Sequence, residues 1–254
     1  MRISIRSSKG GVGKSTIAIS LSKFLAEQGN DVLLVDRDVI GYSSYLAGIT
    51  SPGLVKAVLE GQDAHSIKEI KVGKGSITVL KYFGDGPEYV PNLAKIHANR
   101  ELISYYSKVY RELITSKPFS FFVIDNPPLI RDSDEIYLFE HNEFNYVYPR
   151  VKHSYIFVSD GIDENIKSNL EYMSQLNVKV DQRLAFIINM VRPDELQKYQ
   201  NIVTNIINNL NVRIGGVIPF VENIFQFSGE LKDFPLPKQM RELYVKLVGI
   251  TLEM

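Results

Sequence analysis

The sequence predicts a doubly wound α/β fold, in which a mostly parallel sheet is covered by helices on both faces. Short runs such as Val32–Val35 and Phe121–Ile124 are continuously apolar, which is typical of strands buried on both faces. Stretches with helical spacing separate these runs, and this alternation favours a parallel sheet. Glycine and proline are scattered, without a linker, repeat or low-complexity tract. We therefore expect residues 1–254 to form a single domain.

The expected elements follow in order along the chain. The helix from Lys14 to Gln28 has the clearest pattern, because its apolar residues share one face and Gly29 stands where a left-handed cap is expected. Strands are expected at Arg2–Arg6, Val32–Val35, Ser76–Leu80, Phe119–Ile124, Ser154–Ser159, Leu184–Ile188 and Gly216–Ile218. Further helices are expected at Leu54–Glu60, Ala98–Thr115, Glu164–Leu176, Asp194–Asn208 and Lys238–Val248.

The composition excludes several classes of protein. The chain has 29 basic and 29 acidic residues and no cysteine. Zero net charge argues against a strongly basic nucleic-acid binder, although a local basic patch stays possible. Without cysteine, disulfides, Cys-ligated zinc, Fe–S clusters and thiol nucleophiles are excluded. Apolar runs are too short to span a membrane, and the first residues lack the apolar core of a secretory signal, so we expect a cytoplasmic protein.

A glycine-rich loop follows the first expected strand and opens the first helix. It reads Gly10-Gly11-Val12-Gly13-Lys14-Ser15-Thr16. Glycines let backbone N–H groups turn toward phosphate oxygens, and the helix N-terminus adds partial positive charge. Lys14 brings a positive charge to the outer phosphates, and the Ser15 hydroxyl can ligate Mg²⁺. The loop therefore predicts a site for the phosphates of a nucleotide.

A second lysine distinguishes this loop from its common form, because Ser8 occupies the usual first glycine position and Lys9 precedes Gly10. The string from Lys9 to Thr16 resembles the deviant Walker A motif of the ParA/MinD superfamily of P-loop ATPases. The resemblance implies a P-loop NTPase fold with ATP and Mg²⁺ as cofactors, bound by residues 9–16. It also implies that Lys14 takes part in catalysis. Lys9 would reach the partner's nucleotide in an ATP-bound homodimer, acting like an arginine finger.

Two carboxylates follow the second strand, in Asp36-Arg37-Asp38. Carboxylates beside a triphosphate are costly unless a cation or a proton-transfer role compensates them. The segment looks like the family's D-x-D switch, which implies that Asp38 orients or deprotonates the attacking water and that Asp36 supports the magnesium shell. As an alternative, the pair simply begins a helix. Arg37 departs from the small or apolar residue usual at this position, which leaves the local charge balance open.

Three later residues match further motifs of the family. Phe121–Ile124 ends in Asp125-Asn126-Pro127-Pro128, which resembles the Walker B strand, and Asp125 would hold Mg²⁺ through a water. The stretch ending at Asn189 resembles the strand whose terminal asparagine hydrogen-bonds adenine. Pro219 matches the proline that packs near the base. For Asp125 the alternative is a cap on the next element, and for Asn189 and Pro219 it is ordinary sheet packing.

The segment from Ile130 to His153 is longer than the family pattern and rich in aromatic residues. One interpretation is a helix and turn buried against the sheet edge. The other is a partner or dimer surface, because aromatic-rich surface segments favour interfaces.

The resemblance is strongest to short ParA-type ATPases of chromosome or plasmid partition. It implies slow ATP hydrolysis, an ATP-state homodimer that binds DNA non-specifically, and a ParB-like activator that resets it. The lysines between Lys56 and Lys81 form a basic stretch, which a solvated face explains equally well. One alternative is a MinD-like positioning ATPase, whose hallmark is a Lys-rich amphipathic C-terminal helix. Residues 238–254 are poor in cations, so we expect them to pack on the domain and expect no membrane binding. A non-catalytic ATP-binding scaffold is the other alternative.

Overall fold

Eight strands form one sheet in the computed structural model, which describes residues 1–62 and 65–252. Glu253 and Met254, the end of the expected domain, lie outside the described residues. The strand order is β3-β4-β2-β5-β1-β6-β7-β8, and every neighbouring pair is parallel except β3 with β4. The predicted mostly parallel sheet is confirmed. The strands are β1 Arg2–Arg6, β2 Asp31–Asp36, β3 Ile67–Val72, β4 Gly75–Lys81, β5 Phe121–Asp125, β6 His153–Asp160, β7 Arg183–Val191 and β8 Ile214–Pro219.

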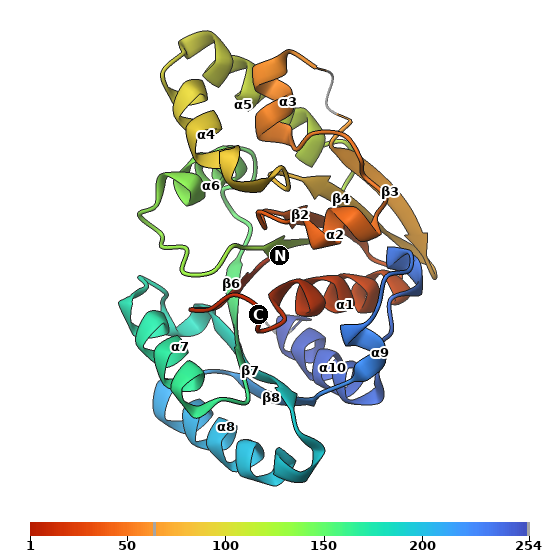
Figure 1. The fold of residues 1–254 in the computed structure, drawn as a ribbon, viewed down its shortest axis with the longest axis vertical. Helices are drawn as coiled ribbons and strands as arrows, with labels where there is room; N and C mark the ends of the chain where they lie inside the picture. The colour runs from red at the N-terminus through yellow and green to blue at the C-terminus, as the bar shows by residue number, and fades with distance from the viewer. Residues whose placement is uncertain (63–64, 253–254) are drawn as a thin grey trace.

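Helices cover both faces of this sheet (Figure 1). One face packs against α1, α2 and α10, and the other against α3 to α6 over β2, β4 and β5, and against α7 and α8 over β6 and β7. This two-sided cover explains why the central strands are almost wholly apolar. The helices are α1 Lys14–Glu27, α2 Tyr42–Leu46, α3 Leu54–Glu60, α4 Tyr89–His97, α5 Arg100–Ile114, α6 Glu135–Val147, α7 Asp163–Gln175, α8 Leu196–Leu210, α9 Glu222–Phe225 and α10 Lys238–Leu252.

The edge strand β3 is absent from the sequence prediction. Its sequence, Ile-Lys-Glu-Ile-Lys-Val, places three charged residues in a strand that is mostly exposed or half-buried. Among the described residues it pairs only with β4, as an antiparallel hairpin turned at Gly73. Charged side chains are common on edge strands, where they discourage pairing with other chains, and they hide the apolar run that marks a buried strand.

The aromatic segment forms helix α6, which packs on the middle of the sheet. Tyr137 and Phe144 are buried, and the Phe144 ring lies 4.9 Å from that of Phe122 on β5. The expectation of a helix against the sheet edge is therefore wrong in its location. The reason is the strand order, since β5 and β1 occupy the centre of the sheet and leave room for α6 between α5 and α7. Tyr146 stays 70% exposed at the far end of the helix.

None of the helices in the described part of the chain combines the length and the apolar character needed to cross a bilayer.

Candidate nucleotide site

The phosphate loop lies at the carboxyl end of β1, near the centre of the sheet, where open α/β sheets place their ligand sites. Gly11 and Gly13 have φ angles of 78° and 94°, a region that side chains disfavour. A Cβ atom on Gly13 would lie 2.1 Å from Asn189 Nδ2, so this position also lacks space for one. Gly13 caps α1 without any side-chain hydrogen bond. The first N–H groups of α1 therefore stay available for an anion.

Lys14 begins α1 and is 5% exposed. Its Nζ atom donates a long hydrogen bond of 3.4 Å to the carbonyl oxygen of Lys9, across the loop. Burial lowers the pKa of Lys14, while the carboxylates of Asp125 and Asp38 act in the opposite direction. The ammonium group is thus poorly solvated and close to two acids, which suits it to bind an incoming phosphate.

Asp36 and Asp125 end neighbouring strands and lie opposite each other in the register of β2 and β5. Both are fully buried. Burial raises the pKa of Asp36 to about 6, although hydrogen bonds from the Ser44 N–H and hydroxyl, each 2.7 Å long, oppose this rise. Burial and the charge of Asp36 raise the pKa of Asp125 well above its ordinary range. Two buried carboxyl groups this close together favour the binding of a cation, which stabilises their charged forms.

Asp125 fits the role of magnesium partner better than Asp36 does. Neither carboxylate oxygen of Asp125 has a hydrogen-bond partner within the described residues, although both are buried. The Ser15 hydroxyl and the Lys14 ammonium lower its pKa, so the three side chains share one small site. Both oxygens of Asp36 already accept hydrogen bonds, from Ser44 and from the Asp38 N–H. Ser15 and Asp125 are thus the residues that would hold Mg²⁺, whereas Asp36 accepts hydrogen bonds from Asp38 and Ser44 in the segment beside them.

Asp38 is half-buried at the start of the loop after β2. Its Oδ1 atom accepts a hydrogen bond from the Ile40 N–H at 2.9 Å, and its own N–H donates to Asp36 at 3.2 Å. Asp38 therefore lies beside the buried acids but keeps contact with solvent, where a water could reach it.

The side chain of Lys9 is exposed, and its ammonium group contacts α7 and not the phosphate-binding residues of its own loop. Its Nζ atom donates to Asn165 Oδ1 on α7 at 3.2 Å, and the Asn165 amide is held by both oxygens of Asp160. One turn later, Asn169 accepts a hydrogen bond from the Ser8 N–H at 2.9 Å. Neither asparagine was predicted as a site residue from the sequence. Their spacing of four residues on one helix face is visible in the sequence, but nothing there connects that face to the loop.

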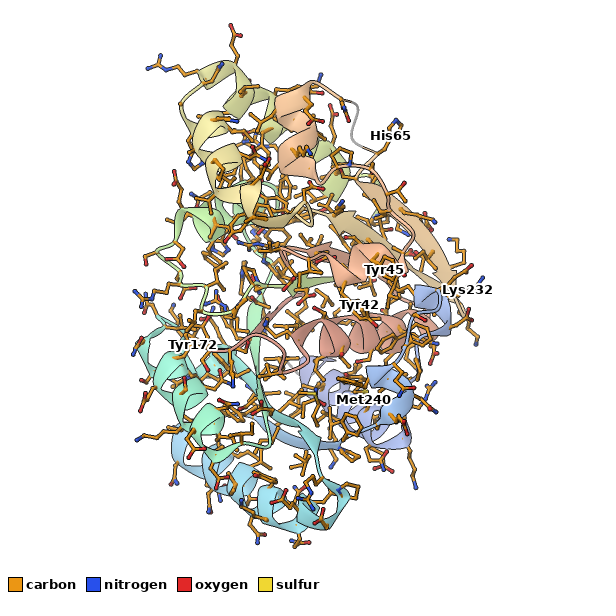
Figure 2. All side chains as sticks on the ribbon, viewed as in Figure 1. Tyr42, Tyr45, His65, Tyr172, Lys232 and Met240 are labelled. Atoms are coloured by element: carbon orange, nitrogen blue, oxygen red, sulfur yellow. The ribbon has the colours of Figure 1, made fainter. Side chains whose placement is uncertain are left out.

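An apolar cavity lies beside the loop, between the ends of β7 and β8 and helices α9 and α10. Thr16, Asn189 and Pro219 line it together with Phe220, and so does Met240 of α10, which Figure 2 labels. Asn189 is 4% exposed and donates from Nδ2 to the Val12 carbonyl at 3.1 Å. Its Oδ1 atom is then left to accept from a ligand. The structure thus brings the two expected base-site residues, Asn189 and Pro219, to one cavity.

A buried ion network behind the site was also missed. Arg37 is fully buried and contacts Glu140 of α6, which in turn binds Arg2. The unusual arginine between two aspartates was visible in the sequence. Glu140 carries no such signal, because its partners Arg2 and Arg37 lie 138 and 103 residues away in the chain.

The basic stretch after α2 is largely neutralised. Lys56 pairs with Glu60 at 3.9 Å, Lys71 with Glu69 at 2.7 Å and Lys81 with Asp85 at 2.9 Å. The side chains of Lys56 and Lys71 are 38% and 79% exposed and favour the interpretation as a solvated face, whereas Lys81 is buried.

Comparisons with known proteins agree with this geometry. The family described as the CobQ/CobB/MinD/ParA nucleotide binding domain matches residues 3–233. The chromosome-partitioning ATPase Soj of Thermus thermophilus is 43% identical over 61 residues, which are 24% of this chain and 24% of Soj. The match thus covers only a quarter of either protein.

Two solved structures share the fold over nearly the whole chain. The MinD cell division protein of Aquifex aeolicus has a TM-score of 0.65 at 22% identity, with 98% of this chain and 97% of that protein covered. A plasmid partition protein of Borrelia burgdorferi bound to AMPPNP has a TM-score of 0.63 at 20% identity, with 99% and 98% covered. The family model spans the glycine loop and the buried acids and matches most of the chain, so the chain belongs to the CobQ/CobB/MinD/ParA nucleotide-binding family.

Proposed function

We propose that this protein is an ATP-dependent dimerisation switch that hydrolyses Mg²⁺-bound ATP and acts in chromosome or plasmid segregation in the cytoplasm. One observation carries the proposal. Lys14 is buried among acids inside the loop, whereas Lys9 of the same loop is exposed and held on α7, outside its own phosphate cradle. A second lysine in that place is suited to serve a nucleotide in a facing copy of the chain.

Each part of the site then has a chemical task. The loop N–H groups and Lys14 bind the phosphates. Bound Mg²⁺ would neutralise charge on the outer phosphates and would be held by the Ser15 hydroxyl and, through water, by Asp125. Asp38 orients the attacking water and takes its proton. Lys9 of the partner copy stabilises the charge that develops on the transferred phosphoryl group.

The base cavity supports a preference for adenine. Because Asn189 Nδ2 is engaged with the Val12 carbonyl, its Oδ1 atom presents an acceptor to the cavity. Adenine offers an exocyclic amino donor there, whereas guanine offers a carbonyl oxygen, which would be left facing another acceptor. ATP is therefore the expected nucleotide.

DNA is the cargo that we propose, and the Soj match and the similarity to the Borrelia partition protein support it. We propose that the ATP dimer binds DNA non-specifically and that a ParB-like partner stimulates hydrolysis. MinD-like proteins share the fold equally well. In this chain, however, α10 packs on the domain, with Leu243, Tyr244 and Leu247 buried.

The deciding experiment is light scattering after size exclusion, on Asp38→Ala with Mg²⁺·ATP and with ADP, followed by a DNA mobility shift on each peak. We expect a dimer only with ATP, and DNA binding that weakens steeply with salt. An ATP dimer that ignores DNA would move the cargo to a membrane or a protein. A monomer with both nucleotides would contradict the dimerisation switch.

Three variants separate the roles of the residues. Lys14→Ala should abolish ATP binding, while Lys9→Ala should keep ATP binding in the monomer but lose the dimer and its hydrolysis. Lys167→Ala, an exposed lysine on α7, is the matched control and should behave like the parent. Wild-type rates of hydrolysis in Asp38→Ala would instead favour a non-catalytic role for that residue.

A further inference from the structure

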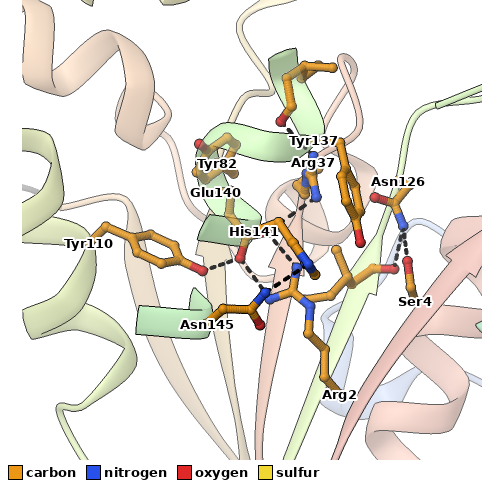
Figure 3. A network of polar contacts seen from close by, with 12 residues as sticks. Arg2, Ser4, Arg37, Tyr82, Tyr110, Asn126, Tyr137, Glu140, His141 and Asn145 are labelled. Carbon is orange, nitrogen blue, oxygen red and sulfur yellow. Dashed lines mark hydrogen bonds and ion pairs between the residues drawn. The ribbon is translucent and has the colours of Figure 1, made fainter. Parts of the chain in front are cut away.

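Arg37 stands between the two aspartates of the D-x-D segment, yet its side chain contacts α6, on the sheet face opposite α1. Its Nη2 atom donates to the Ile136 carbonyl at 2.7 Å, and Nη1 donates to Glu140 Oε2 at 3.3 Å (Figure 3). Its backbone N–H donates to the Asp125 carbonyl at 2.9 Å. Arg37 is thus connected to the end of β5 and to two turns of α6, while its chain neighbour is Asp38.

Glu140 has no need of Arg37 to neutralise its charge. Both of its oxygens accept hydrogen bonds from Arg2, at 2.9 and 2.5 Å, and the Tyr110 hydroxyl donates to it as well. Burial alone would raise the pKa of Glu140, but Arg2 first and Arg37 next lower it to about 2. With one carboxylate and two guanidinium groups, the buried cluster carries an excess positive charge.

Stability alone therefore does not explain why an arginine occupies position 37. It is fully buried, and its Nε atom has no partner within the described residues. Replacing a buried ion by an apolar side chain of similar volume is often neutral or stabilising. An incompletely satisfied buried arginine beside the candidate catalytic acid points to a role in positioning.

We propose that Arg37 couples α6 to Asp38, so that the helix and the acid change position together when ATP binds. The coupling runs from the Asp38 backbone through the Arg37 guanidinium to Ile136 and Glu140. Arg37 is a positioning residue, since it acts through Asp38 and through α6. The proposal rests on the proposed function, because it takes ATP as the ligand and Asp38 as the acid. By linkage, whatever shifts α6 would also shift Asp38.

Tryptophan fluorescence can report the position of α6, since the chain contains no tryptophan. Tyr146→Trp places one on α6 at a site that is 70% exposed and keeps an aromatic ring against Arg111. We expect Mg²⁺·ATP to change the emission of this reporter protein. Nucleotide binding is measured separately, with a fluorescent ATP analogue.

Arg2→Met and Arg37→Met form a matched pair in this reporter protein. Each removes one arginine from Glu140, but within the described residues the Arg2 side chain forms no hydrogen bond or ion pair with the D-x-D segment. We expect both variants to bind ATP. Arg2→Met should lose stability, because it removes the bidentate partner of Glu140, whereas Arg37→Met should keep or gain stability. Only Arg37→Met should reduce the emission change, by threefold or more. Only this variant should also lower kcat, about ten- to a hundredfold with little change in KM, because a misplaced acid slows the chemical step. Arg37→Lys, which keeps the charge without the fork, should fall between and stands in if Arg37→Met does not fold.

The outcomes separate the two proposals. If the parent reporter fails to bind ATP, the proposed function fails. If it binds ATP without an emission change, or if both arginine variants lose the change equally, the coupling through Arg37 is wrong. Unchanged kcat in Arg37→Met would also overturn it.

Discussion

The two lysines of the phosphate loop differ in their surroundings, because one is buried and the other is exposed. Lys14 is enclosed by Asp125 and Asp38, whereas Lys9 is solvated and held by one hydrogen bond to Asn165. Asn165 is itself fixed by Asp160, so the acceptor is preorganised. Lys9 must leave this acceptor before it can serve a partner's nucleotide. The contact therefore favours the monomer in the proposed switch.

We predict that Asn165→Ala strengthens the ATP-dependent dimer. The variant removes a hydrogen bond that only the monomer makes, and each of the two protomers gives it up on dimerisation. An exposed hydrogen bond of this kind contributes about 0.5–1 kcal/mol, so the dimer dissociation constant should fall about five- to thirtyfold. Analytical ultracentrifugation of the Asp38→Ala background with Mg²⁺·ATP measures this constant. Asn201→Ala, on the exposed face of α8, is the control and should leave it unchanged. A weaker dimer would show that Asn165 supports the interface instead.

At the scale of the elements, the sequence predicts well whatever repeats locally. The bounds of β1 and α3 agree with the prediction, because alternating β-branched residues and a helical stripe are properties of a few adjacent residues. The charged hairpin strand β3 has no such run, and its identity as a strand depends on β4. The short helices α2 and α9 contain too few residues for a period to be visible.

The candidate site divides in the same way. Asp36 and Asp125 were identifiable because each ends a strand, and Asn189 because it lies near the end of one, where parallel strands converge. Lys14 was identifiable from the glycine-rich loop that precedes it. The partners that hold them come from far along the chain. Glu140 lies 103 residues from Arg37, and Asn169 lies 161 residues from Ser8. One sequence without its fold contains no information that pairs these residues.

The contact between α6 and β6 predicts a stability change in weak acid. His141 and His153 have rings 5.0 Å apart, and burial, followed by the charge of Arg2, lowers the pKa of each to about 4. Both are therefore neutral in the folded protein near pH 6, and His141 Nε2 can accept from the Asn145 amide. Their folded pKa lies below the unfolded value, so the stability they contribute is complete above pH 6.5 and is lost as the pH falls toward 4.

We expect the double variant His141→Gln/His153→Gln to lose less stability than the parent between pH 7 and pH 4.5. Urea unfolding at a series of pH values gives the free energy of unfolding of each protein. The comparison uses the slope against pH and not the absolute stability, because the substitutions alter packing as well. Identical slopes would mean that both histidines titrate normally in the fold.

At the scale of the whole molecule, the packing of α10 bears on whether the proposed cargo is a membrane or DNA. Its apolar face completes the core, where Met240, Leu243, Tyr244 and Leu247 are buried. The Tyr244 hydroxyl is hydrogen-bonded to Ser20 of α1 at 2.5 Å. Gly216 of β8 leaves space that Leu243 fills, since a Cβ there would lie 2.7 Å from the leucine side chain. The helix is thus fitted to its place and offers little apolar surface to a bilayer.

We therefore predict that the ATP-bound protein does not sediment with anionic vesicles. Insertion of α10 would first have to expose four buried side chains, at about 1.5–3 kcal/mol each, or roughly 6–12 kcal/mol in total. Few basic residues of α10 could offset that free energy by binding anionic lipid, since Arg241 is paired with Glu27 at 2.7 Å and Lys238 with Glu242 at 3.7 Å. Sedimentation of Asp38→Ala with vesicles, in ATP and in ADP, tests this directly. Binding that appears only with ATP and disappears in Leu243→Glu would show that α10 leaves the core on dimerisation, and would favour the MinD-like cargo over DNA.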